Sequence, residues 1–94
     1  MKVRVRFMAI LKPLAGKPYT EVEVDEQASL LDVILRACSN NSRLIERLLS
    51  DRLQSIKPDI IVLVDGVDVN VVGDLKMSIK GVREVTLIPS VHGG

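Results

Sequence analysis

The residues with the clearest chemical potential stand at the end of the sequence, where Gly93 and Gly94 follow Val91 and His92. A terminal carboxylate is a poor electrophile until it becomes a mixed anhydride, and an enzyme that makes one must draw the terminus deep into its active site. Glycine favours that entry because it has no side chain and adopts nearly any backbone angle. The stretch after Pro89 reaches at most about 17 Å when extended. The ending therefore predicts that Gly94 is the reacting group and that a partner enzyme supplies the catalysis.

Other residues offer less chemistry. Cys38 is the single cysteine, and its place near the end of an apolar helical segment favours a buried, inert thiol over one that holds sulfur. A short tail cannot hold His92 in a catalytic geometry, so we expect it to be recognised by a partner or to have no role. Asp65, Asp68 and Asp74 lack the ligand spacing of a calcium loop and fit turns better. We expect neither a metal site nor a catalytic residue in the chain itself.

Hydrophobic periodicity predicts two strands and a helix in the first half. Residues 2–10 begin with strict alternation of apolar and charged side chains, and residues 19–24 alternate in the same way. Between them, residues 11–18 contain prolines and a glycine and are expected to form a loop. Ser29 opens a capping-box pattern before an apolar run, which predicts an amphipathic helix over residues 30–38.

The second half predicts a further helix and three strands. The spacing of leucine and isoleucine indicates a helix over about residues 43–54. Residues 60–64 are a β-branched apolar strand, which an Asp-Gly turn joins to a short strand at residues 67–69. Residues 70–82 look irregular, and residues 84–89 form the last strand.

This order of elements favours one small α+β domain. We expect a mixed sheet of four to five strands packed on one main helix, with a second short helix. With 94 residues, 47% of them apolar and 2% aromatic, the chain should form a single aliphatic core. Residues 1–89 are expected to be the folded domain and residues 90–94 a flexible tail.

The strand at residues 60–64 is apolar on both of its faces. Strands of this kind are usually covered on both sides, yet the expected helices suffice for one side of the sheet. If Val62 and Val64 face the core, the opposite face carries an uncovered apolar patch, which predicts a protein interface. The residues expected on that face are Ile61, Leu63 and Ile88, bordered by Arg4 and Arg6. The alternative is that the second helix or a loop folds over them.

Charge and hydropathy argue against two classes of partner. The 13 basic residues are interspersed with 12 acidic ones, and aromatic side chains for base stacking are scarce, so direct nucleic-acid binding is not expected. No apolar run approaches the roughly 20 residues of a membrane-spanning helix. The charged start of the sequence does not resemble a signal peptide, so a cytoplasmic protein is expected.

The last third of the sequence resembles the ubiquitin-like sulfur carriers. After the strand, residues 89–94 read PSVHGG. Pro89, Val91 and the two glycines are similar to the ending of the small subunit of molybdopterin synthase. The final Val-His-Gly-Gly is similar to the Leu-His-Gly-Gly of the ubiquitin-related modifier branch, which residues 62–75 also resemble. By element order the resemblance covers essentially the whole chain, and at the level of residues it runs from Val62 to the end.

This resemblance implies a β-grasp, ubiquitin-like fold and the role of a carrier and co-substrate rather than an enzyme. A ubiquitin-activating-like adenylyltransferase would use ATP and magnesium to adenylate the Gly94 carboxylate. A persulfide would then displace AMP and leave a thiocarboxylate on Gly94. The chain would bind no cofactor of its own. The tail that the activating enzyme recognises would be Pro89, Ser90, Val91, His92 and Gly93.

The sequence is compatible with more than one destination for the activated terminus. The sulfur acceptor could be a tRNA wobble uridine, reached through a separate thiolase, or a molybdopterin precursor held by the larger synthase subunit. The same activated Gly94 could instead be joined to target-protein lysines, which would make the chain a protein modifier. A third hypothesis is a non-covalent interaction module, for which Gly93 and Gly94 would be dispensable.

Overall fold

The computed structural model describes residues 1–50 and 55–90. Its strands are β1 (Lys2–Phe7), β2 (Tyr19–Glu23), β3 (Ile60–Val64), β4 (Val67–Asp68) and β5 (Glu84–Pro89). Its helices are α1 (Leu11–Ala15), α2 (Leu30–Cys38), α3 (Ser42–Leu48) and α4 (Val69–Val72).

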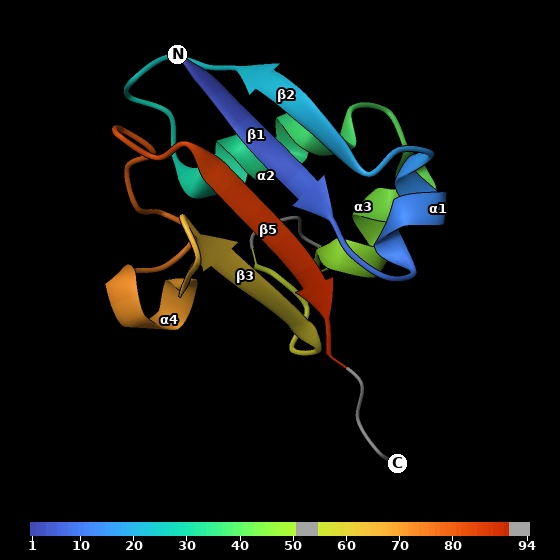
Figure 1. Cartoon of the computed structure of the whole chain (residues 1–94). Coiled ribbons are helices and arrows are strands. Elements are labelled where there is room, and N and C mark those ends of the chain that lie inside the picture. Colours follow the sequence, from blue (N-terminus) through green and yellow to red (C-terminus); the bar gives the residue numbers. More distant parts are fainter. Residues whose placement is uncertain (51–54, 91–94) are drawn as a thin grey trace.

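The strands form one mixed sheet of five strands in the order β2-β1-β5-β3-β4. The central strands β1 and β5 run parallel, and the other neighbours are antiparallel. Helix α2 crosses behind the sheet, with α3 beside it, while the opposite face of the sheet is open (Figure 1). The expected α+β architecture, a β-grasp sheet on one main helix, is confirmed.

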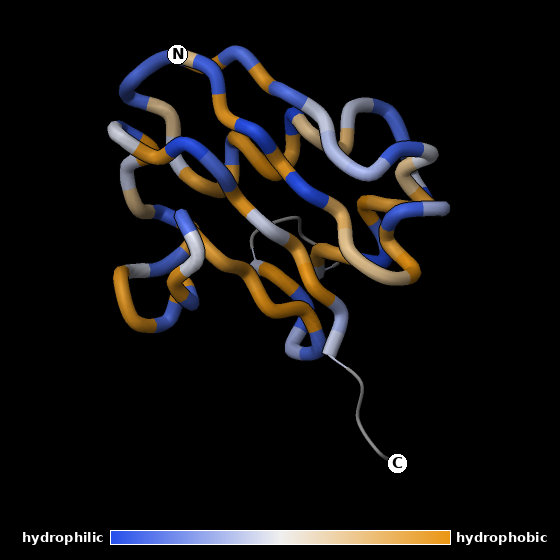
Figure 2. The backbone as a smooth tube through the Cα atoms, viewed as in Figure 1, coloured by the Kyte–Doolittle hydropathy of each residue, from blue (hydrophilic) through white to orange (hydrophobic). Residues whose placement is uncertain are grey.

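The core lies between the sheet and α2 and is aliphatic apart from one aromatic ring. In β1 and β5 alternate side chains are fully buried, among them Val5, Phe7 and Leu87, while their neighbours face outward. Figure 2 shows this alternation of hydrophobic and hydrophilic positions along the strands. No polar or charged side chain of the described residues is buried, so the core depends on apolar packing alone.

The main helix begins as its sequence predicts. The Ser29 hydroxyl accepts a hydrogen bond from the Asp32 backbone N–H at 3.1 Å, and the Asp32 carboxylate accepts one from the Ser29 N–H at 2.9 Å. This reciprocal pair satisfies two backbone donors that the first turn would otherwise leave unpaired. The helix spans residues 30–38, and its inward side buries Leu30, Val33 and Ile34 at the core.

The expected loop at residues 11–18 instead contains helix α1. Pro13 lies in its first turn, where a backbone N–H has no partner in the helix to lose. Gly16 follows the last helical residue with φ 77° and donates its N–H to the Lys12 carbonyl, which is a left-handed cap. The proline and glycine that predicted a loop are therefore the start and stop signals of a short helix.

Three other boundaries differ from expectation. The first strand ends at Phe7 rather than at residue 10. The second helix ends at Leu48, because Leu49 is extended and pairs with Ile56 in an isolated bridge; residues 51–54 lie outside the described part. The segment expected to be irregular begins with helix α4, which also takes Val69 out of the expected strand.

Candidate functional site

Strand β5 delivers the chain to the point where the predicted reactive tail begins. Pro89 pairs with Ile60 of β3. Ser90 adds one more rung, because its N–H donates to the Asp59 carbonyl at 2.6 Å and its hydroxyl donates to the same oxygen at 2.9 Å. Ser90, expected as the first residue of the tail, is thus hydrogen-bonded to the sheet. The other tail residues, Val91, His92, Gly93 and Gly94, lie outside the described residues, and their recognition stays a prediction.

The opposite end of β5 is fixed by a turn between β3 and β4. Asp65 and Gly66 both have left-handed backbone angles, φ 47° and 84°, which fit a tight hairpin turn. The Asp65 carboxylate accepts hydrogen bonds from the Arg83 N–H at 3.0 Å and the Glu84 N–H at 2.9 Å. This aspartate therefore holds the start of the strand whose far end carries the tail.

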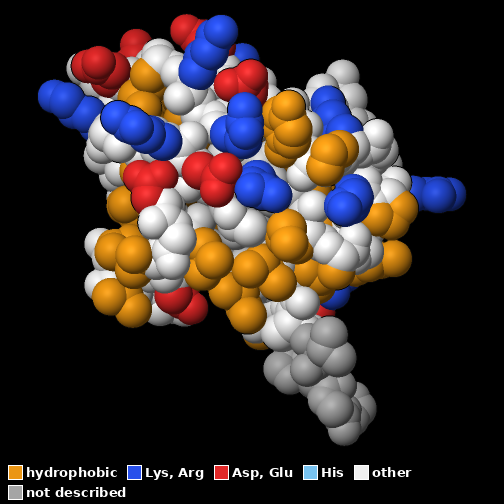
Figure 3. Space-filling model, in the orientation of Figure 1, with side chains coloured by type: hydrophobic (Ala, Val, Ile, Leu, Met, Phe, Trp, Pro, Cys, Tyr) orange, Lys and Arg blue, Asp and Glu red, His pale blue; other side chains and the backbone are white. Residues whose placement is uncertain are grey.

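The open face of the sheet carries the apolar patch that the sequence predicted. Ile61 pairs with Ile88 and is 36% exposed, while Leu63 and Ile88 are half-buried. The adjacent residues Val62 and Leu87 point to the other face of the sheet and are buried in the core. Figure 3 shows hydrophobic side chains gathered on the lower part of this face. Helix α3 lies behind the sheet and does not cover them (Figure 1); their role as an interface stays a prediction.

The apolar surface is wider than the sequence indicated. Phe7 pairs with Leu87 at the end of the β1–β5 ladder. The next residue of the chain, Met8, therefore lies beside Ile88. On the other side, helix α4 exposes Val71 at 77% of its surface. We call this surface the apolar half of the open face; its residues are Met8, Ile61, Leu63, Val71, Val72 and Ile88. Two sequence signals could have located these added residues: the alternation of β1 continues to Met8, and Val71 and Val72 are adjacent valines after the polar Asn70.

The charged half of the open face lies over β1, β2 and the start of β5. Arg4 is in register with Glu21 on one side and Glu84 on the other, and its guanidinium lies 4.3 Å from the centre of the Tyr19 ring. Arg6 approaches Glu84 at 4.0 Å. Both predicted border arginines are thus engaged within the molecule. Thr86 of β5 lies in register between Arg6 and the apolar Leu63.

With this geometry in place, comparison with known proteins gives the family. The profile of Urm1, the ubiquitin related modifier, matches residues 2–94. The chain belongs to this family. No curated protein sequence matches it significantly. This protein is thus a ubiquitin-like protein of the sulfur-carrier and modifier class.

Solved structures similar to this Urm1-family member have the same fold. A chain of the BexX/CysO complex from Amycolatopsis orientalis is 29% identical with TM-score 0.74; the match covers 98% of this chain and 99% of that one. Mycobacterium tuberculosis CysO is 28% identical with TM-score 0.72, covering 95% and 99%. SAMP1 from Haloferax volcanii, 24% identical with TM-score 0.84 and full coverage of both chains, is similar in fold.

Within this Urm1-family chain, Cys38 is a poor candidate for carrying sulfur. Its side chain is 1% exposed, which confirms the expected burial. Burial raises the pKa of the Cys38 thiol from 9.0 to about 11, so the thiol is protonated at neutral pH. Because the thiolate is the nucleophilic form, this group has little reactivity in the folded protein.

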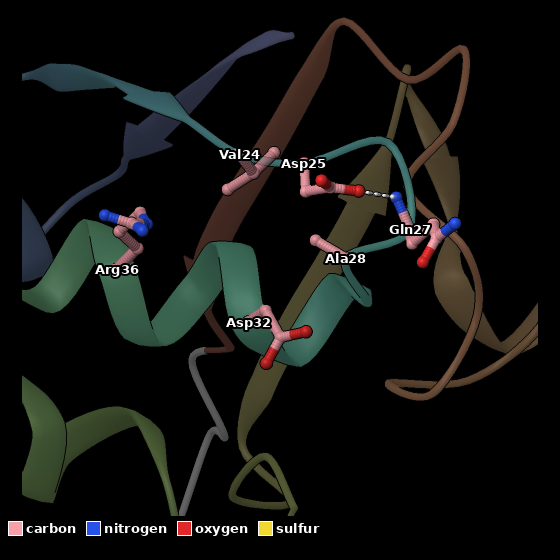
Figure 4. Close-up of a pocket in the computed structure, with 6 residues that line it drawn as sticks. All are labelled: Val24, Asp25, Gln27, Ala28, Asp32 and Arg36. Carbon is pink, nitrogen blue, oxygen red and sulfur yellow. Dashed lines mark hydrogen bonds between the residues drawn. The ribbon is translucent and has the colours of Figure 1, made fainter.

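A surface pocket in the β2–α2 region shows no convergent chemistry (Figure 4). The Asp25 carboxylate accepts a hydrogen bond from the Gln27 N–H at 2.8 Å, and the Asp32 carboxylate is part of the helix cap. These acids are explained by their turn and cap. In the described ranges, no three or more His, Cys, Asp or Glu side chains are grouped to hold a metal ion. No helix in those ranges is long and apolar enough to cross a membrane.

Proposed function

We propose that the protein is a sulfur carrier whose Gly94 carboxylate is activated by a ubiquitin-activating-like adenylyltransferase and converted to a thiocarboxylate. The observation that supports this proposal is a juxtaposition. The strand that leads into PSVHGG runs along an uncovered apolar surface, so one partner could hold that surface and receive the tail at the same time. The chain would contribute a substrate group and a docking surface, and the partner would contribute the catalytic residues.

The proposed chemistry has two stages. The Gly94 carboxylate attacks the α-phosphate of ATP, held with magnesium by the partner, and pyrophosphate leaves as the acyl adenylate forms. The terminal sulfur of a persulfide then attacks the acyl carbon, and AMP leaves. A second thiol of the sulfur donor cleaves the resulting acyl disulfide, which leaves the thiocarboxylate on Gly94 and a disulfide on the donor. Dependence on cellular ATP fits a cytoplasmic location for this step.

Docking would draw its free energy from the apolar half of the open face. Apolar surface removed from water contributes about 25 cal/mol per Å². Ile61, Leu63 and Ile88 lie together there, and no described helix covers them. Arg4 and Arg6 lie on the same face and could orient a partner through charge, which affects association rate more than final affinity.

The sulfur acceptor is proposed from the ending of the chain. The Urm1 match over residues 2–94 and the similarity at His92 favour transfer to a tRNA wobble uridine through a separate thiolase. Pro89 and the Asp65-Gly66 turn instead favour the alternative acceptor, a molybdopterin precursor held by a larger synthase subunit. A cell that produces the chain without its last two residues distinguishes these acceptors, because thiolated tRNA and molybdoenzyme activity can be measured in the same culture.

The direct test of the carrier proposal is the intact mass of the protein purified from its native cell. We expect a species in which one oxygen is replaced by sulfur, and we expect its loss when Gly94 is deleted. Two results together would contradict the proposal and favour a non-covalent module. The first is the absence of the sulfur-containing species in cells with active sulfur transfer, and the second is that deletion of Gly94 leaves thiolated tRNA and molybdoenzyme activity unchanged.

A second candidate function is favoured by the family itself, which is named for a modifier. A lysine amine of a target protein could attack the acyl carbon of the adenylated Gly94, with AMP as the leaving group, to form an isopeptide bond. No Lys or Arg follows Arg83, so trypsin would leave a remnant from Glu84 to Gly94 on the modified lysine. Peptides with this remnant would support conjugation, and their absence from cells with charged protein would reject it.

A further inference from the structure

Ser90, the first residue after β5, is held by two hydrogen bonds, where the end of a strand would ordinarily have one. The Asp59 carbonyl oxygen accepts both the Ser90 backbone N–H at 2.6 Å and the Ser90 hydroxyl at 2.9 Å. The backbone bond continues the ladder of β3 and β5 by one rung, and the hydroxyl adds a second bond to the same acceptor. The place where the chain leaves the domain therefore depends on where the Asp59 backbone is held.

Asp59 is in turn tied to the helical layer. Its carboxylate receives the Arg47 guanidinium in a two-pronged contact, with nitrogen–oxygen distances of 2.9 and 3.1 Å. Arg47 belongs to α3, which packs against α1 and α2 rather than lying on the open face. Paired contacts of this kind fix direction as well as distance, because the guanidinium and the carboxylate are both planar. Arg47, Asp59 and Ser90 thus connect the helices behind the sheet to the root of the tail.

We propose that the Arg47–Asp59 pair is a positioning clamp that sets the direction and length of chain offered to the activating enzyme. This inference rests on the proposed function, since it concerns delivery of Gly94. Four residues follow Ser90 in the sequence, and they can reach at most about 14 Å. With so short a reach, the position of Ser90 decides whether the terminal carboxylate arrives at the reacting phosphate.

The clamp acts by ordering the tail root before binding. Fixing the backbone of one residue carries an entropy loss equivalent to about fivefold to thirtyfold in an equilibrium constant. In the intact protein folding has already ordered Ser90. In a variant without the ion pair, Ser90 is less ordered before binding, so part of this entropy loss occurs when the chain binds the enzyme. Binding of the chain weakens, while the chemical step inside the enzyme is unchanged once the tail is seated.

The test is ATP–pyrophosphate exchange by the adenylating enzyme of the source cell, with Arg47→Met and Asp59→Asn as substrates. We expect each variant to raise KM about threefold to tenfold and to leave kcat within about twofold. The double variant should be no worse than either single one, because both remove the same pair. Arg43→Met is the matched control. Arg43 is on the same helix and lines the same surface groove as Arg47, and it makes no ion pair within residues 1–50 and 55–90.

A second measurement uses the chain alone and needs no enzyme. The backbone order parameter of the Ser90 amide should be near 0.85 in the natural chain and fall toward 0.6 in Arg47→Met, with thermal unfolding little changed. An unchanged Ser90 order parameter, or an equal KM rise in Arg43→Met, would overturn the clamp. If the natural chain gives no exchange, the proposed function fails, and the order parameter still decides whether the clamp exists.

Discussion

The two halves of the open sheet face are built on opposite principles. In the charged half, Arg4 lies over Tyr19 and between two glutamates in register, and Arg6 approaches Glu84. In the apolar half, Ile61 and Ile88 face outward with no described element over them. One half has its partners within the molecule, and the other lacks them.

This difference indicates where a partner gains most from contact. Exposed ion pairs contribute about 0–1 kcal/mol each, and a partner must first compete with the existing contacts. Exposed apolar side chains have no contacts within the molecule to give up, and their removal from water is favourable. We therefore expect the apolar half to supply docking affinity and the charged half to supply orientation and solubility.

The largest expected effect separates the two sides of one strand. Leu87→Ala removes a fully buried side chain of β5 and should lower the free energy of unfolding by about 2–5 kcal/mol through lost packing and a residual cavity. Ile88→Ala, its neighbour on the open face, should lower it by less than about 1 kcal/mol. Urea unfolding of both variants checks this. Equal losses would mean that the open face is covered in the protein and that the contrast between its halves is wrong.

The next effect concerns docking. Leu63→Asp places a charge in the middle of the apolar half and should weaken binding of the activating enzyme about tenfold to a hundredfold. Thr86→Asp, in register beside it, is a control with the same charge change at a polar position. Titration calorimetry or KM for ATP–pyrophosphate exchange measures both. A smaller effect from Leu63→Asp than from Thr86→Asp would move the docking surface elsewhere.

Substitution in the charged half should change binding less. Arg4→Met leaves Tyr19 and the two neighbouring glutamates without the guanidinium, and we expect a change in affinity of about twofold to fivefold, mainly in the association rate. The change should disappear at high salt, because exposed charges are screened there. Stopped-flow association at two ionic strengths measures it. A salt-independent loss as large as that of Leu63→Asp would show that Arg4 is a buried anchor of the interface.

The smallest expected effect is at Cys38, behind the sheet and away from both halves. Cys38→Ala should leave charging of the chain unchanged. Burial raises the pKa of the Cys38 thiol to about 11, so the unfolded chain, with its ordinary value near 9, loses this proton first as pH rises. Stability from this group is therefore complete below pH 9 and is lost between pH 9 and 11. The difference between unfolding curves of the natural chain and Cys38→Ala isolates this loss, and a rise of stability with pH would contradict it.

The sequence predicts helices and strands best where a pattern has only one structural interpretation. The capping box at Ser29 and the period-two strands gave elements that the structure confirms. Pro13 and Gly16 were ambiguous, because the same residue types begin and end a short helix and also make loops. Helix α3 stops early because Leu49 pairs with Ile56, and the helical spacing of leucine and isoleucine does not reveal such a bridge.

The candidate site was predictable in part for similar reasons. With Val62 and Val64 assigned to the core, the period of two in a strand places Ile61 and Leu63 on the opposite face, and Gly93 and Gly94 stand out through their types alone. The contact of Arg47 with Asp59 could not be read from the sequence, because it joins two elements whose packing is set by the whole core. The two-bond hold on Ser90 was missed because a serine after a proline has no distinctive pattern.

We propose that the chemistry occurs at the backbone carboxylate of Gly94, which reaches another protein's active site because the last two residues have no side chains. The most direct measurement is ATP–pyrophosphate exchange with a chain in which Gly93 and Gly94 are both replaced by alanine. We expect kcat/KM to fall about a hundredfold or more, because added Cβ atoms displace the carboxylate from its reacting position. Exchange as fast as with the natural chain would contradict the claim.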